Sequence, residues 1–425
     1  MPCWQHGPPA CRHDRDRDRD RHVTATVTAH AATRRDVLRS AAGLALAAAV
    51  SLGLARFSYA LLLPAMRSDL GWTYFTAGAM NTTNAAGYLL GALLAPRALA
   101  RFDARALMLA GGALAALLLA AHGAVRSDAL LYALRLGTGV ASAMSFIAGG
   151  LLAARLAGTQ ATGAGARPVP AGLVLGLYYG GTGLGIMLSA LLARPGAAGQ
   201  ALDWPAAWLA LAGASAAATA LTAAATRALR APPVRSAARA VVPWAPFGFA
   251  LAGYLMFGLG YIGYMTFIIT LLREQGMSAA QLTAFYLLLG ACVVASSWLW
   301  AGLLQRVRGG QALALLNGLL ALATALPVWS AHPVAVFVSG ALFGAVFLSV
   351  VAATTALVRH NLPPAQWPGG IAAFTILFAA GQIAGPALVG AIADGPGGLL
   401  RGLAWSAAAL ALGAALALCQ RPLQR

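Results

Sequence analysis

Two arginines inside long apolar segments are the residues of this sequence best suited to chemistry. Arg56 lies in SLGLARFSYALLLPAM, within an apolar run from about 41 to 63, and Arg135 lies in YALRLGTGVAS. A run of ~20 apolar residues is long enough to cross a bilayer. A guanidinium near the bilayer centre costs about 2.5–3.5 kcal/mol even on the mildest insertion scale, so the default interpretation of such a residue is a functional site.

Each arginine has polar neighbours at helical spacing. Tyr59 follows Arg56 by three positions, and Thr138 and Ser142 follow Arg135 by three and seven. Residues at these spacings share a helix face. We therefore predict that Arg56 binds an anionic or carbonyl-bearing group with Tyr59 beside it. The alternative is that Arg56 caps helix carbonyls or braces the bundle. For Arg135 the alternatives are substrate contact, proton relay through a neighbouring group, and bracing of helices.

Other polar side chains lie in further apolar runs. Asn81, Asn84 and Tyr88 follow an i, i+3, i+7 pattern and form one polar stripe. Such a stripe lines a pocket or hydrogen-bonds a neighbouring helix. Tyrosines combine an apolar body with a polar tip, which suits an amphipathic pocket and equally suits ordinary packing. The predicted substrate-binding residues are Arg56, Tyr59, Asn81, Asn84, Arg135, Tyr178, Tyr261, Tyr264 and Gln382.

The elements that position these residues are predicted to be transmembrane helices. The 425-residue chain is 60% hydrophobic and 9% charged, with a mean hydropathy of +0.74, whereas soluble domains are ~25% charged. Lipid offers the backbone no hydrogen-bond partners, so each span is expected to be helical. Twelve apolar runs are present, at 40–63, 73–95, 105–123, 129–153, 171–193, 205–226, 246–271, 282–304, 311–331, 333–357, 369–392 and 399–419.

The distribution of arginine predicts the orientation. All 29 basic residues are arginine, and the net charge is +18. If the N-terminus is cytoplasmic, the inner connections hold 14 arginines and the outer ones 5, before the tail is counted. Basic residues favour the cytoplasmic side, so both termini are expected inside. The arginines are scattered between apolar runs and form no phosphate-binding stripe, so nucleic acid is not an expected partner.

The sequence divides into two matching halves at a basic, proline-containing connection. GLARFSYALLLP at 53–64 aligns with GLGYIGYMTFII at 258–269, which places Arg56 over Tyr261. Tandem six-helix halves with a solute bound between them near the midplane are typical of transporters. The predicted organisation is a disordered cytoplasmic tail at 1–38, a six-helix bundle at 39–228, a cytoplasmic linker at 229–243 and a second six-helix bundle at 244–425.

The motifs GLARFSYALLLPAM, NTTNAAGYLLGALLA, GYIGYMTFIITLLRE and FTILFAAGQIAGPALVGAIAD resemble the major facilitator superfamily, and more closely its bacterial YbfB/YjiJ-type branch. The resemblance covers about 40–420. It implies the major facilitator fold, with twelve transmembrane helices in two pseudo-symmetric bundles, in an all-α protein of the bacterial inner membrane. One departure is GALLAPRALARFDAR, which has no acid directly before Arg97. The gating ion pair that this superfamily motif provides is therefore not implied.

No Asp or Glu lies inside a predicted span, so two buried cations would leave a positive cavity that attracts an anion. We predict a secondary active transporter of a small anionic or carbonyl-bearing solute, working by alternating access. The alternatives are a drug or sugar efflux permease on the same fold and a non-transporting membrane sensor.

The chain has no HExxH and no GxSxG with triad partners, so no enzyme and no cofactor or metal are expected. The expected partners are a small-molecule substrate, protons as candidate coupling ion and the lipid bilayer. The chain is expected to be a monomer.

Overall fold

The computed structural model describes residues 33–158, 169–193, 203–229 and 244–423, in which helices are the regular elements and no strand occurs. Residues 1–32 of the predicted tail and 230–243 of the predicted linker lie outside the described residues. The first half contains α1 (Arg34–Ala48), the π-helix η1 (Ala49–Phe57), α2 (Tyr59–Leu70), α3 (Tyr74–Leu99), α4 (Ala104–Ala124), α5 (Asp128–Gly158), α6 (Ala171–Leu192) and α7 (Trp204–Ala225). The second half contains η3 (Ala245–Phe247), α8 (Gly248–Glu274), α9 (Ala279–Leu299), α10 (Ala301–Arg306), α11 (Gln311–Trp329), α12 (Pro333–Asn361), η4 (Pro364–Gln366), α13 (Trp367–Ala393) and α14 (Gly398–Leu418).

The helices of the described residues correspond to the twelve predicted spans. Eleven helical segments are long and apolar enough to cross a membrane, and the first of them joins α1, η1 and α2 into 37 residues. Helix α3 is the twelfth, at 26 residues, and it carries the polar stripe of Asn81 and Asn84. The predicted all-α membrane fold is confirmed.

The first helix begins earlier than the predicted tail boundary at residue 38. Thr33 caps α1, because its side chain accepts the amide of Asp36 while the Asp36 carboxylate accepts the Thr33 amide. This capping box satisfies amides that would otherwise lack a partner at the helix start. Residues 34–38 are therefore helical. Hydropathy alone placed the boundary too late because it does not detect a cap.

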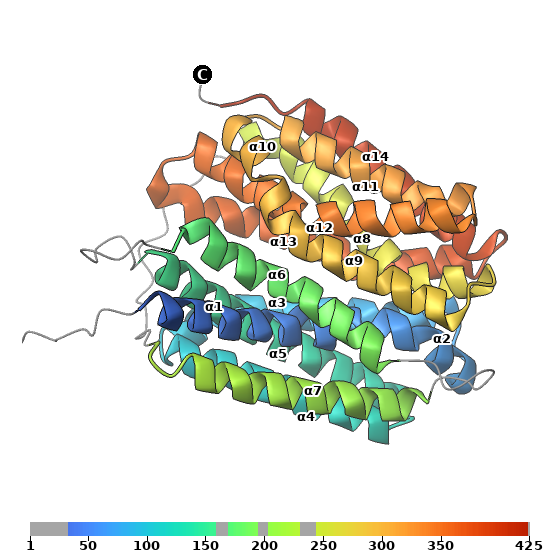
Figure 1. The fold of residues 1–425 in the computed structure, drawn as a ribbon. Coiled ribbons are helices and arrows are strands. Elements are labelled where there is room, and N and C mark those ends of the chain that lie inside the picture. The colour runs from blue at the N-terminus through green and yellow to red at the C-terminus, as the bar shows by residue number, and fades with distance from the viewer. Residues whose placement is uncertain (1–32, 159–168, 194–202, 230–243, 424–425) are drawn as a thin grey trace, which may run out of the picture.

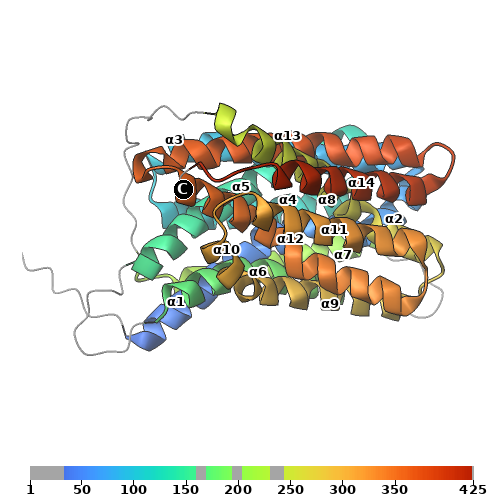
Figure 2. The ribbon, with the colours of Figure 1, turned by 90° about the horizontal axis from the view of Figure 1, so that it is seen from above.

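The helices form two bundles, one from each half of the chain, which lie side by side (Figure 1). Helices α1 to α7 occupy the lower part of the view and α8 to α14 the upper part, with α4, α7 and α14 at the periphery. The start of α1 and the end of α14 lie at one end of the bundle, which we call the terminal end (Figures 1 and 2). The ends of α2, α8 and α13 lie at the opposite end.

Glycines allow the same pair of helices to cross closely in each half. A Cβ on Gly53 of η1 would lie 2.4 Å from the Cα of Gly185 in α6. In the second half, a Cβ on Gly258 of α8 would lie 3.2 Å from the Cα of Gly381 in α13. Small residues permit this backbone approach between membrane helices. The crossings therefore fix the first helix of each half against the fifth.

The η1–α6 crossing gives a stability prediction. A Cβ on Gly185 would lie 2.3 Å from the carbonyl oxygen of Ala49, so Gly185→Ala must force the helices apart. Overpacking of this kind costs about 1–3 kcal/mol, and we expect a lower thermal unfolding temperature in detergent. Gly213→Ala on α7 is the control, since no atom lies within 4 Å of its Cβ. Equal unfolding temperatures for the two variants would contradict this packing.

Candidate functional site

Arg56 lies near the end of the π-helical segment η1 (Ala49–Phe57). The amide of Ser58 donates to the carbonyl of Gly53, five positions earlier, at 3.1 Å, and α-helix resumes at Tyr59. π-Helical turns are rare and occur often at functional sites. The change of helix type also alters the angular relation between Arg56 and the residues that follow it.

The Arg56 side chain lies at the boundary between the two halves. It is 4% exposed, and its NH2 donates a hydrogen bond to Oε1 of Gln382 on α13. Its guanidinium carbon lies 5.3 Å from the ring centre of Tyr88 and 5.8 Å from that of Phe57. Within the described residues its Nε has no hydrogen-bond partner. The two predicted residues Arg56 and Gln382 are thus brought together, and the hydrogen-bond acceptor that Gln382 offers is neutral.

Arg135 forms a second buried cationic centre, closer to the opposite end of the bundle. It is 1% exposed, and its NH2 donates to Oδ1 of Asn81 at 3.1 Å. Its guanidinium lies 4.5 Å from the ring centre of Tyr59, whose hydroxyl donates to the carbonyl of Ala77 at 2.9 Å. Its NH1 has no hydrogen-bond partner among the residues that the structure describes. We predicted that Tyr59 lies beside Arg56, but its ring lies against Arg135. The helix changes from π to α between positions 56 and 59, and this change turns Tyr59 away from the face of Arg56.

The polar stripe of α3 connects the two centres. Asn81 accepts from Arg135 and donates to Thr266 Oγ1 of α8 at 2.7 Å, which links the halves. Asn84 donates to the backbone carbonyl of Arg135 at 3.0 Å. Tyr88, two turns along the stripe, lies under Arg56. The predicted set of binding residues omitted Tyr88, although its i+7 spacing from Asn81 placed it on the same helix face. It also omitted Thr266, whose contact with Asn81 crosses between the halves and leaves no pattern along one helix.

The three remaining predicted tyrosines differ in their surroundings. Tyr261, the repeat equivalent of Arg56, is buried and stacks on Phe378 with ring centres 5.5 Å apart. Tyr264 shares a hydrogen bond of 2.8 Å with Ser339 inside the second half. Tyr178 donates to a backbone carbonyl on α5 inside the first half. The structure thus holds Tyr178 and Tyr264 within their own halves.

No carboxylate balances either buried guanidinium in the described residues. The ion pairs found there are Arg126 with Asp69 at 2.6 Å and Arg67 with Glu274 at 3.9 Å, both near the opposite end and both partly exposed. Removing an ion from water is costly unless it is paired or well hydrogen-bonded. The two buried arginines therefore form an uncompensated positive region.

Carboxylates close the opposite end of the bundle across the two halves. Both oxygens of Asp394, at the end of α13, accept amides at the start of α3, from Tyr74 at 2.8 Å and from Phe75 at 2.9 Å. The Glu274 carboxylate of α8 accepts the hydroxyl of Tyr74, whose ring lies 3.7 Å from the guanidinium of Arg67. We call these contacts the end clamp. A carboxylate at a helix N-terminus also complements the helix dipole.

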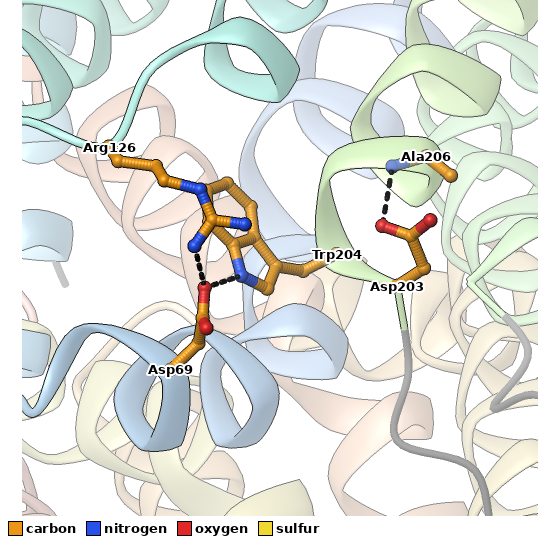
Figure 3. A network of polar contacts seen from close by, with 5 residues as sticks. All are labelled: Asp69, Arg126, Asp203, Trp204 and Ala206. Carbon is orange, nitrogen blue, oxygen red and sulfur yellow. Dashed lines mark hydrogen bonds and ion pairs between the residues drawn. The ribbon is translucent and has the colours of Figure 1, made fainter.

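A second polar network at the same end belongs to the first half alone (Figure 3). Asp69 of α2 accepts hydrogen bonds from Arg126 at 2.6 Å and from the indole of Trp204 at 2.9 Å. Asp203 caps α7 by accepting the amide of Ala206 at 3.2 Å. A depression of about 750 Å³ lies between these residues and α8. This network joins α2, the connection between α4 and α5, and α7 within the first half.

Comparisons with known proteins agree with this architecture. The model of the family described as "Uncharacterised MFS-type transporter YbfB" matches residues 48–418. None of the curated proteins compared with the chain matches it.

Two solved structures share the fold. The inward-facing, unoccupied bacterial homologue of the human lysosomal transporter Spinster is 13% identical, with a TM-score of 0.69 over 91% of this chain and 97% of its own. The nucleoside transporter NupG, as a D323A mutant, is 14% identical, with a TM-score of 0.69 over 89% of this chain and 98% of its own. The family match spans most of the sequence and the shared fold spans both halves, so this multi-pass membrane protein belongs to the YbfB-type family of major facilitator superfamily transporters.

Proposed function

We propose that this transporter is a secondary active carrier of a small anionic or carbonyl-bearing solute, with Arg56 as the principal binding group. The observation that carries the proposal is that Arg56, 4% exposed, has a neutral partner, Gln382, from the other half and an Nε without a partner. A carboxylate matches a guanidinium in charge and in the fork geometry of its donors. Such a solute would accept a hydrogen bond from the Nε of Arg56 and would supply the negative charge that Gln382 lacks.

Charge favours an anion over a neutral or cationic solute. Two unit charges 4 Å apart attract by about 4 kcal/mol at an effective dielectric constant of 20. Arg135 adds to the positive potential, because it too lacks a carboxylate partner in the described residues. A cationic solute would meet repulsion from both groups. The remaining predicted contacts, Asn81, Asn84, Tyr59 and Tyr261, would shape the region, while Tyr178 and Tyr264 would support it from within their halves.

The position of Arg56 also supports alternating access. Arg56 belongs to the first half and Gln382 to the second, so a solute bound between them contacts both halves. A ligand shifts a conformational equilibrium only when it binds the two states differently. A solute that replaces the Arg56–Gln382 hydrogen bond alters the interaction between the halves directly. The end clamp then corresponds to a state closed at the opposite end.

The orientation follows from the arginine distribution. We propose that the terminal end is cytoplasmic and that the protein lies in a bacterial inner membrane as a monomer, which makes the end clamp periplasmic. Protons are the proposed coupling ion. Of the rim acids Asp69 and Asp394, Asp394 is the better placed for that role, because its carboxylate joins the halves, whereas Asp69 pairs within one half. Protonation of Asp394 would weaken its acceptance of the α3 amides.

The role of Arg56 is tested by transport in proteoliposomes. Arg56→Ala should weaken binding of labelled organic acids about 10- to 150-fold, the range for losing a hydrogen bond to a charged group. The affinity of Arg56→Lys for these acids should lie between those of the wild type and Arg56→Ala, because lysine keeps the charge but lacks the planar fork of the guanidinium. Arg306→Ala, at an exposed position on α10, is the control. Unchanged anion flux in Arg56→Ala would refute the proposal, and binding without flux would indicate a sensor.

The end clamp is tested by the accessibility of a buried position beneath it. Thr270 is 2% exposed at the base of the depression, and Thr270→Cys in a background without native cysteines reports opening through maleimide labelling. Asp394→Ala removes a cap worth about 0.5–2 kcal/mol, so labelling should accelerate by about two- to thirtyfold. Asp203→Ala also removes a cap at this end, but one within the first half. Equal labelling rates in the two variants would exclude Asp394 as a clamp.

A further inference from the structure

Two aromatic side chains lie close to the Arg56 guanidinium. Tyr88 lies 5.3 Å away on α3, and Phe57 lies 5.8 Å away on η1. Phe57 meets Phe347 of α12 edge to face, with ring centres 5.8 Å apart. The aromatic surroundings of Arg56 thus cross from the first half into the second.

The rings of the second half form a stacked group that we call the aromatic wall, made of Tyr254, Phe257, Tyr261, Phe347 and Phe378. Phe347 lies over Tyr261 at 6.1 Å and 12°, and Tyr261 lies over Phe378 at 5.5 Å and 20°. Phe257 and Tyr254 stack on Phe378 at 5.2 Å and 5.0 Å. Offset stacks at these separations add stability beyond the area that they bury.

Two rings retain accessible surface, one from each half: Tyr88, which lies beside Arg56, and Phe378 of the aromatic wall. Tyr88 and Phe378 are partly exposed, whereas Tyr254, Phe257 and Tyr261 are buried. Phe378 precedes Gln382 by four positions on α13, which is about one helical turn. A ligand held between Arg56 and Gln382 would therefore extend its body toward Tyr88 and Phe378.

We propose that the solute is an aromatic carboxylate, with its carboxylate on Arg56 and its ring against Tyr88 and Phe378. The inference rests on the proposed function, because it takes Arg56 as the binding group. A sugar needs several hydrogen-bond partners, which ring faces do not supply. An aromatic cation would suit the rings but is repelled by Arg56 and Arg135. A short aliphatic acid would leave the ring faces unused.

The test is calorimetric titration of the purified full-length protein in nanodiscs with benzoate, cyclohexanecarboxylate, acetate and uridine. Cyclohexanecarboxylate matches benzoate in charge and size but lacks a π-face. Benzoate should bind about two- to tenfold more tightly than cyclohexanecarboxylate, the difference expected for one aromatic contact. Acetate should bind most weakly, because it has only the carboxylate.

Variants identify the ring responsible. Phe378→Leu should lower the preference for benzoate over cyclohexanecarboxylate, because Tyr88 then remains as the single ring contact, and Phe378→Tyr should retain the full preference because the ring remains. Phe337→Leu is the matched control, since Phe337 is also partly buried but contacts Phe285 at 6.3 Å, outside the aromatic wall. Loss of the preference in Phe337→Leu as well would point to general destabilisation and count against the inference.

The outcomes separate the two proposals. Equal binding of benzoate and cyclohexanecarboxylate, with Arg56→Ala weakening both, would overturn the aromatic inference and leave the anion carrier standing. Binding of uridine without binding of any carboxylate would overturn the aromatic-carboxylate inference and the anionic part of the proposed function, and would leave a neutral carbonyl-bearing solute. Absence of benzoate binding to the wild-type protein overturns the aromatic inference in every case.

Discussion

The structure depends on the cost of holding a guanidinium in a low-dielectric interior. Arg56 and Arg135 are almost fully buried, and each is hydrogen-bonded to neutral groups. Breaking such contacts without replacement leaves a charge buried and unpaired, which is strongly destabilising. The charge therefore favours conformations in which a partner is present. A mobile anion is a partner that can be supplied and withdrawn, which is what a carrier requires.

Close backbone packing holds the helices around Arg56 and Gln382 in fixed positions. Glycine crossings fix η1 against α6 and α8 against α13, and these four elements carry or adjoin Arg56, Tyr261 and Gln382. Within this frame, η1 adopts π-helical geometry and presents Arg56 toward the other half. Helices that approach this closely transmit a displacement at the site, because packed interfaces do not deform continuously.

The two halves have diverged at equivalent positions. Arg56 supplies charge in the first half, whereas its repeat equivalent Tyr261 belongs to the aromatic wall of the second. One half therefore places a charge at this position and the other places a ring. At the opposite end, Asp394 of the second half caps α3 of the first. A pseudo-symmetric frame thus carries different side chains in its two halves.

The sequence by itself determined the twelve spans, the two halves and the presence of two intramembrane arginines, because apolar length and charge placement are local properties. It also contained the α3 stripe, since i, i+3 and i+7 positions share a helix face. Only the tertiary structure decided that Arg56 meets Gln382, 326 positions away, and that Tyr59 lies against Arg135. Such pairings depend on how helices rotate against one another and on the π-helical segment, which changes the helical phase after Arg56. The spacing of residues along one helix predicts neither the rotation of neighbouring helices nor the position of a π-helical segment.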